Sequence, residues 1–148
     1  MIVILSEEQG FELLLPAQFA EIELVCLEVE GFLARQGLSR LAFAILLGVR
    51  EALTNAIRHG SGLDPAQEIR FGMSLEGERL CLQISDQGPG FNWRGRETLP
   101  PPHLAEGGRG LAIIQRYFDT VQFNERGNEL RLEIKVKDGN GGIAGVEA

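Results

Sequence analysis

Three polar side chains follow one another at intervals of four in the stretch "REALTNAIRHG", residues 50–60. At about 100° per residue, Glu51, Asn55 and His59 fall on one side of a helix. A carboxylate and a neutral amide oxygen one turn apart suit a hard cation such as Mg²⁺, which takes oxygen ligands and shares them with phosphates. The row therefore predicts a site for a metal-bound phosphate, with a solvated helix face as the alternative.

A second group stands where an alternating apolar run ends, in "SDQGPGF", residues 85–91. Asp86 closes the run, and a carboxylate at a strand end can accept a hydrogen bond from a ligand amine. Gly88 and Gly90 follow, and residues without a Cβ let a ligand approach the backbone closely. The pattern predicts a binding pocket, and an ordinary polar turn is the alternative.

The third group is "EGGRGLAIIQ", residues 106–115, where glycines lead into an apolar helical pattern. Exposed backbone N–H groups around Gly108 and Gly110 form an anion site at a helix N-terminus, and Arg109 adds a positive charge. Glycine before a helix is also common turn chemistry. Each of the three groups is therefore a weak signal by itself.

The best-known phosphate motifs are excluded by the sequence. No G-x-x-x-x-G-K-[ST] motif occurs. A G-x-G-x-x-G motif that starts at Gly88 would need glycine at position 93, where Trp93 stands, and no βαβ unit surrounds it. A transition-metal site from Glu51, His59 and His103 would lack a familiar ligand spacing.

The composition limits the class of protein. The 148 residues are 44% hydrophobic and 24% charged, which predicts one globular domain. The net charge is −7 without a cluster of Lys or Arg, so no nucleic-acid surface is expected. Cys26 and Cys81 sit among apolar residues and are expected to be buried and reduced. The apolar runs are too short for a secretory signal or a bilayer span, so we expect a cytoplasmic protein without membrane contact.

The elements that position the three groups follow from hydrophobic periodicity and from glycine and proline breaks. The expected strands are residues 11–16, where Pro16 ends the strand, and residues 68–77, 79–88, 120–125 and 128–137. The expected helices are residues 20–37, 39–60 and 110–119, with Ser39 as the N-cap of the second. This order predicts an α+β two-layer sandwich, a mainly antiparallel mixed sheet with helices on one face, over residues 1–137. The Gly-rich residues 138–148 are expected to form a disordered tail.

The helix expected at residues 39–60 has small residues beside its polar row. Ala44 and Gly48 share the stripe of Glu51 and Asn55, away from the main apolar arc. A glycine inside a helix costs about 1 kcal/mol relative to alanine. We expect these small residues to make room for a ligand that lies along this face.

Together and in this order, the three groups resemble the motifs of the GHKL superfamily of ATP-binding proteins, whose fold is the Bergerat fold. "EALTNAIRH" looks like the N box, "DQGPGF" like the first glycine box and "GGRGL" like the second. Over nearly the whole chain, including "TNAIRHG" and "GNELRLEIK", the sequence is similar to the bacterial anti-sigma-factor serine kinases. That resemblance implies a single ATP-binding kinase domain at residues 1–137.

The resemblance also implies roles for individual residues. It makes Asn55 the ligand of Mg²⁺, Glu51 the catalytic base, and Asp86 the acceptor of the adenine amino group. The residues that would contact the nucleotide elsewhere are Gly88 and Gly90 at the base and Gly108, Arg109, Gly110 and Leu111 at the phosphates. His59 matches the end of the N box, and a structural role at the helix end is as well supported. Asn128 follows Gly127 where the family usually has threonine, which leaves nucleotide contact there open.

The implied function is an ATP- and Mg²⁺-dependent kinase that phosphorylates a serine of a STAS-domain anti-anti-sigma protein. The same protein would hold a sigma factor or similar regulator inactive and would form a homodimer. One alternative is a nucleotide-binding module that sequesters a partner without catalysis. A histidine kinase half acting on a separate protein and a purely structural interaction domain are the other two.

Overall fold

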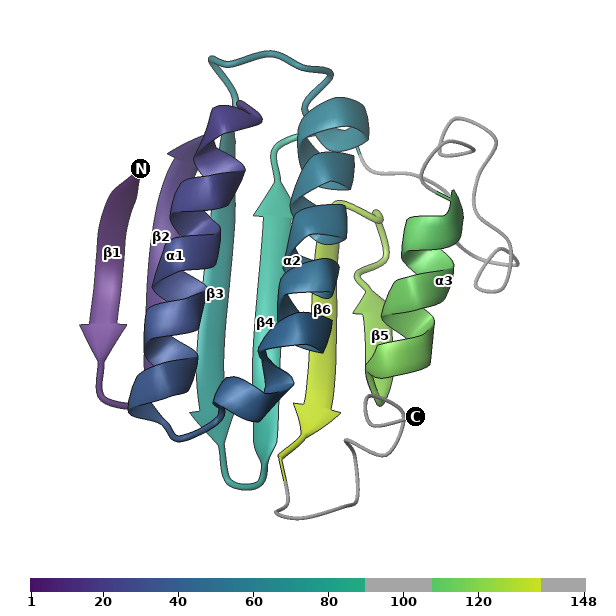
Figure 1. The fold of residues 1–148 in the computed structure, drawn as a ribbon. Coiled ribbons are helices and arrows are strands. Elements are labelled where there is room, and N and C mark those ends of the chain that lie inside the picture. Colours follow the sequence, from purple (N-terminus) through teal and green to yellow (C-terminus); the bar gives the residue numbers. More distant parts are fainter. Residues whose placement is uncertain (90–107, 137–148) are drawn as a thin grey trace.

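The computed structural model describes residues 1–89 and 108–136 (Figure 1). The strands are β1 (Ile2–Glu7), β2 (Gly10–Pro16), β3 (Glu68–Glu76), β4 (Arg79–Asp86), β5 (Thr120–Phe123) and β6 (Glu129–Lys135). The α-helices are α1 (Ala20–Arg35), α2 (Ala42–Asn55) and α3 (Gly108–Tyr117). A 3₁₀ turn, Ser39–Leu41, precedes α2, and a π-helical segment, Ala56–Gly60, follows it.

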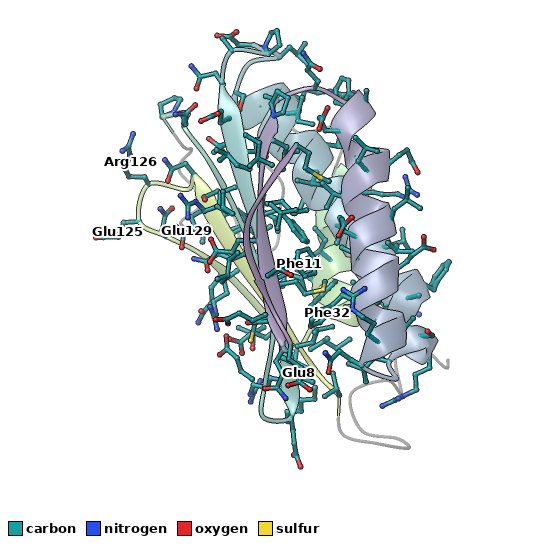
Figure 2. The ribbon with its side chains drawn as sticks, turned by 90° about the vertical axis from the view of Figure 1, so that its left-hand side faces the viewer. Glu8, Phe11, Phe32, Glu125, Arg126 and Glu129 are labelled. Carbon is teal, nitrogen blue, oxygen red and sulfur yellow. The ribbon has the colours of Figure 1, made fainter. Side chains whose placement is uncertain are left out.

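The strands form one six-stranded sheet in the order β1-β2-β3-β4-β6-β5. Every pair of neighbours among these described strands is antiparallel, so the mixed character that we predicted is not seen in this part of the chain. All three helices lie on one face of the sheet, and the opposite face carries no helix in the described part (Figure 2). The predicted two-layer α+β sandwich is confirmed.

The strand β1 was not predicted. Its sequence, Ile2 to Glu7, begins with consecutive apolar residues and lacks the alternation that marks a half-buried strand. It pairs with β2 in a hairpin, with a register shift between Val3 and Leu5. The chain therefore starts with two strands before α1, where the sequence had indicated one.

The core fills the space between the sheet and the helices. Every second residue of the inner strands points into it, as the pleat of a strand requires. Phe11 of β2 meets Phe32 of α1 with ring centroids 5.4 Å apart (Figure 2). The other fully enclosed core residues include Leu13, Leu15, Val25, Val29, Ile45, Val49, Leu53, Ile69, Phe71, Leu82 and Leu132. Cys26 and Cys81 are buried and unbridged, as predicted.

Of the two helix ends predicted from local sequence signals, the glycine end of α1 is found and the serine N-cap before α2 is not. Gly37 ends α1 in the left-handed region at φ +72°, and the Leu38 N–H donates to Leu33 O at 2.7 Å, which confirms the glycine end. The N-cap predicted at Ser39 is wrong, because Ser39 begins the 3₁₀ turn and no side chain caps it. No helix in the described ranges is long and apolar enough to cross a membrane.

Candidate nucleotide-binding site

The polar row predicted on the second helix is carried by α2. Glu51 and Asn55 are both partly exposed, whereas Val49 and Leu53 on the other side of α2 are fully buried. The α-helix ends at Asn55, and His59 lies in the π-helical segment. The wider turn of that segment changes the direction of the row, so His59 does not continue it with α-helical spacing.

The π-helical segment is defined by its backbone hydrogen bonds. The Ser61 N–H donates to Ala56 O at 2.8 Å, five residues back, which is the spacing of a π turn. The Leu63 N–H donates to Ile57 O at 2.9 Å, six residues back, and closes the end of the segment. Single π turns inside helices are rare and frequently occur at functional sites. Here the π turn directly follows Asn55 and leads to Gly60.

Gly48 has a different role from the one that we predicted. A Cβ built on Gly48 would lie 2.5 Å from Cε1 of Phe118. The Phe118 ring, which directly follows α3, fills the position beside the helix, and Gly48 and Ala44 are buried. The expectation that Gly48 makes room for a ligand is therefore wrong, because its missing Cβ makes room for the Phe118 ring beside α2, and Ala44 is fully buried.

Asp86 ends β4 in a partly buried position. Its Oδ1 accepts a hydrogen bond from the Gly88 N–H at 2.7 Å. Burial raises the pKa of the Asp86 carboxyl above its ordinary value, although the Gly88 N–H and the Arg126 guanidinium act in the opposite direction. A carboxylate that has lost solvent is stabilised by any further N–H donor that reaches it, which is what a ligand amine supplies.

The turn after Asp86 packs directly against the end of the π-helical segment. A Cβ on Gly88 would overlap the carbonyl of Gly60, and a Cβ on Gly60 would lie 2.5 Å from Asp86 Cγ. Two glycines therefore let the backbone that follows Asn55 touch the backbone that follows Asp86. Gly60 was not predicted as a site residue, because its only signal is its place directly after the polar row.

A hydrogen-bond network of Asn124 and Asn128, in the turn between β5 and β6, holds the Gly88 turn. The Asn128 Nδ2 donates to Gly88 O at 3.1 Å, and Asn128 Oδ1 accepts from Asn124 Nδ2 at 2.8 Å. Asn124 Oδ1 in turn accepts from the backbone N–H groups of Gly127, at 2.7 Å, and Asn128, at 3.0 Å. Asn128 thus holds the Gly88 turn through its backbone carbonyl. Asn124 was also missed, because nothing in its local sequence distinguishes it from an ordinary turn residue.

The second glycine group opens α3, which begins at Gly108. The backbone of Gly108, Arg109, Gly110 and Leu111 forms the first turn of the helix, and the positions of their side chains lie outside the described part of the structure. Gly90 and the predicted tail at residues 138–148 also lie outside it. Ile114 and Phe118 are buried against the core and α2.

The ends of these elements meet on one side of the molecule. The end of α2, the end of β4, the start of α3 and the turn between β5 and β6 all lie at the same end of the sandwich (Figure 1). The three groups predicted from the sequence therefore come from elements that converge, although they are far apart in the chain.

The match to a family model agrees with this arrangement. Residues 15–134 match the model of the histidine kinase-like ATPase domain. The chain belongs to this family. The match spans α1 to β5 and β6 up to residue 134, leaves out β1 and all but the last two residues of β2, and confirms the resemblance to the GHKL superfamily.

The chain is also similar in sequence to bacterial proteins named as serine-protein kinases and anti-sigma factors. A serine-protein kinase RsbW from Oceanobacillus iheyensis is 28% identical over 131 residues, which cover 82% of this chain and 83% of that protein. An anti-sigma F factor from Anoxybacillus flavithermus is 34% identical over 85 residues, which cover 55% of this chain and 58% of that protein. Both agree with the narrower resemblance to anti-sigma-factor kinases.

Two solved structures share the fold. The histidine kinase domain of the blue-light activated kinase EL346 from Erythrobacter litoralis superimposes with a TM-score of 0.57 at 18% identity over 87% of this chain and 65% of that one. The histidine kinase AdeS from Acinetobacter baumannii gives a TM-score of 0.52 at 18% identity, over 86% of this chain and 68% of that one. They support the predicted fold class.

Proposed function

We propose that this member of the histidine kinase-like ATPase family is an ATP-dependent serine-protein kinase that works in a partner switch. The observation that carries the proposal is the contact between Gly60 and Gly88. It joins the segment that follows Glu51 and Asn55 to the turn held by the partly buried Asp86. One end of the molecule thus offers oxygen ligands for a metal and an acceptor for an amine.

The residues present fit Mg²⁺ and ATP. The Asn55 amide oxygen is a hard donor of the kind that Mg²⁺ takes, and the Glu51 carboxylate lies one turn before it as the proton acceptor. Asp86 is a carboxylate whose burial raises its pKa, so a donor from the adenine amino group would offset part of its lost hydration. Ser61, next to Gly60, keeps a buried hydroxyl that has no hydrogen-bond partner among the described residues. Such a hydroxyl can accept or donate a further hydrogen bond at this end of the molecule.

Each residue has a distinct role in the proposal. Bound Mg²⁺ and ATP supply a phosphoryl group whose charge is partly neutralised. Asn55 would hold the metal, and Asp86 would orient the base. Glu51 would accept the proton of the attacking serine hydroxyl, because a carboxylate can act as a general base when it lies within hydrogen-bond reach. The backbone N–H groups of residues 108–110 and the Arg109 side chain would bind the phosphates.

The proposed partners come from the same resemblance and from the names of the similar proteins. The substrate would be a serine of a STAS-domain anti-anti-sigma protein, and the second partner a sigma factor or similar regulator that is held inactive. We further propose that the protein acts in the cytoplasm as a homodimer. Phosphorylation of the STAS protein would decide which partner the kinase holds.

Transfer of labelled phosphate tests the proposal directly. The protein is incubated with labelled ATP, Mg²⁺ and purified STAS-domain protein, and the label on serine is measured. We expect Mg²⁺-dependent labelling of the STAS protein. If ATP binds and no STAS partner is labelled, the protein is a nucleotide-dependent binding module, the alternative left by the sequence.

Replacement of Asp86 by asparagine is expected to lower ATP affinity without lowering the stability of the fold. Asp86→Asn keeps the oxygen that accepts the Gly88 N–H but replaces the other acceptor with a donor. Loss of a hydrogen bond to a charged group costs about 1.5–3 kcal/mol, so ATP affinity should fall ~10-fold or more by calorimetry. The thermal midpoint should stay the same or rise, because a partly buried charge has been removed.

Asp64→Asn is the matched control. Asp64 also accepts the backbone N–H two residues ahead, from Ala66 at 3.0 Å, but it is exposed and lies in the loop before β3. The control should bind ATP like the wild type. An unchanged ATP affinity in folded Asp86→Asn would place base recognition elsewhere.

Asn128 is expected to act on the site through the Gly88 turn. Asn128→Ala removes the donor to Gly88 O and the acceptor for Asn124, so we expect a loss of about 1–2 kcal/mol in the free energy of unfolding. ATP affinity should also fall several-fold, because the turn beside Asp86 loses its support. Gln122→Ala, at an exposed position of β5, is the control for both measurements. A stability loss with full ATP affinity would show that the turn keeps its shape without Asn128.

A further inference from the structure

The row of side chains that carries Glu51 and Asn55 continues toward the start of α2. Counted back in steps of four residues, Glu51 is preceded by Leu47 and Phe43. Residues four apart are neighbours on a helix surface, so these four positions form one ridge along α2. The ridge is polar at the nucleotide end and apolar at the start of the helix. Nucleotide binding accounts for the polar half alone.

The apolar half of the ridge ends in an exposed aromatic ring. Phe43 is 65% exposed, more than any other large apolar side chain that the structure describes. Its ring meets the Tyr117 ring at the end of α3 edge to face, with the centroids 6.4 Å apart and the planes at 87°. Leu47 and Tyr117 are partly exposed. We call Phe43, Leu47 and Tyr117 the Phe43 surface, a cluster of the kind that anchors protein interfaces.

The elements that carry the Phe43 surface are basic, although the chain as a whole is acidic. Residues 39–50, which lead into α2 and form most of it, include two arginines and no acidic residue. Residues 108–118, which include all of α3, also have two arginines and no acidic residue. The net charge of the whole chain is −7. The local charge around the surface is therefore opposite in sign to that of the protein.

Two arginines beside the Phe43 surface have no acidic partner among the described residues. The Arg116 guanidinium lies over the Tyr117 ring, 6.0 Å from its centroid. Arg40, one turn before Phe43, donates hydrogen bonds to backbone carbonyls, among them Val136 O at 3.1 Å. Guanidinium groups without a carboxylate, beside an exposed ring, are complementary to a partner that has carboxylates around an apolar side chain.

The length of α2 brings the Phe43 surface within the footprint of a protein bound at the nucleotide end. Phe43 and Asn55 are twelve residues apart in one helix, which is about 18 Å along its axis. An ordinary protein interface covers about 800 Å² on each partner and is wider than this span. A protein that brings a serine to Glu51 therefore also lies over the apolar half of the same ridge.

We propose that the Phe43 surface docks the STAS-domain substrate, through an acidic segment that places an apolar side chain beside Phe43. This proposal rests on the proposed kinase function and adds a docking site to it. Arg40 and Arg116 pair with carboxylates of the substrate while its serine lies at Glu51. Because this contact is remote from the phosphates, it holds the substrate equally well before and during transfer, and it lowers the KM without changing kcat.

Initial rates of serine labelling over a series of STAS-protein concentrations, at saturating ATP, test the proposal. Phe43→Ala should raise the KM for the STAS protein about tenfold or more and leave kcat close to that of the wild type, because an aromatic anchor is lost. Phe43→Glu should raise the KM further, because it adds repulsion of an acidic segment. Leu24→Ala is the control, since Leu24 is 44% exposed on α1 and lies outside the surface. Wild-type ATP affinity shows that each variant is folded.

The dependence of the KM on salt tests the charge of the docked segment. The KM of the wild type should rise with ionic strength, because salt screens exposed charge pairs. Arg116→Gln should raise the KM several-fold at low salt and make it less sensitive to added salt. Arg35→Gln, at an exposed position in the last turn of α1, is the matched control and should behave like the wild type.

The outcomes separate the docking site from the kinase function. A wild-type KM in both Phe43 variants overturns the surface and leaves the proposed function intact. A wild type that labels no STAS protein overturns the proposed function and, with it, the substrate named here. If the Phe43 variants keep the wild-type KM but no longer hold the regulated partner, the surface belongs to that partner and docking of the substrate is overturned.

Discussion

Glu51→Gln should retain ATP binding and lose phosphate transfer to a STAS-domain substrate by about 10²-fold or more. Glutamine keeps the size and hydrogen-bonding reach of Glu51 but cannot accept a proton, and a positioned general base typically contributes 10²–10⁴-fold. Glu51 is partly exposed on α2, so the change should leave the fold intact. The measurement is the initial rate of serine labelling with kinase and substrate at equal concentration.

The outcome separates two classes of protein. Glu28→Gln, at an exposed position of α1, is the control and should transfer phosphate at the wild-type rate. Sequestration of the regulated partner should survive Glu51→Gln, because that activity needs no proton transfer. Equal transfer rates for the wild type and Glu51→Gln would remove Glu51 from the role of base.

Asn55→Ala should lose most of the Mg²⁺-dependent part of nucleotide binding. The amide oxygen of Asn55 is the proposed protein ligand of the metal, and Mg²⁺ is held in such sites by few protein oxygens together with phosphates. Calorimetric titration of ATP with and without Mg²⁺ measures the difference. In the variant, the two titrations should give nearly the same affinity.

Thr54→Ala is the control for a change at the end of α2. Thr54 is also partly exposed and precedes Asn55, but it points in a direction about 100° away around the helix. It should keep the Mg²⁺ dependence of the wild type. Equal losses in both variants would indicate general damage to the helix end and would argue against a metal role for Asn55.

Local patterns predicted the framework of the fold well. The amphipathic period of α1, its glycine end at Gly37 and the hairpin turns at Gly77 and Gly127 are all found, and both hairpin glycines have positive φ. Each of these features depends on residues a few positions apart, which a sequence displays directly. β1 was missed because its apolar residues are consecutive, a pattern that strand alternation does not produce.

Features that depend on distant residues could not be predicted in the same way. Gly48 was interpreted as space for a ligand, whereas the ring that fills that space belongs to Phe118, far along the chain. The hydrogen bond from the Asn128 side chain to the Gly88 carbonyl joins residues 40 positions apart. No local pattern distinguishes these pairs, because their meaning comes from the packing of α3 and from the order of the strands.

The site residues could be predicted from the sequence only in part. Their types and order predicted a common site, and the contact between Gly60 and Gly88 agrees with it. The roles assigned to Glu51, Asn55 and Asp86 stay predictions until the variants are measured. Gly90 and the side chains of Arg109 and Leu111 lie outside the described residues, so their roles rest on the resemblance alone.

The π-helical segment makes the length of the chain between Asn55 and Ser61 a constraint in its own right. The hydrogen bond from the Ser61 N–H to Ala56 O spans five residues. A deletion of one residue would restore four-residue bonding and carry Gly60 about 100° around the helix axis, away from the Asp86 carboxylate. Substitutions of Arg58 or His59 keep this spacing, whereas a gap of one residue removes it. Among related chains, the count of residues after the N-box asparagine should therefore be a sharper mark of this architecture than their identities.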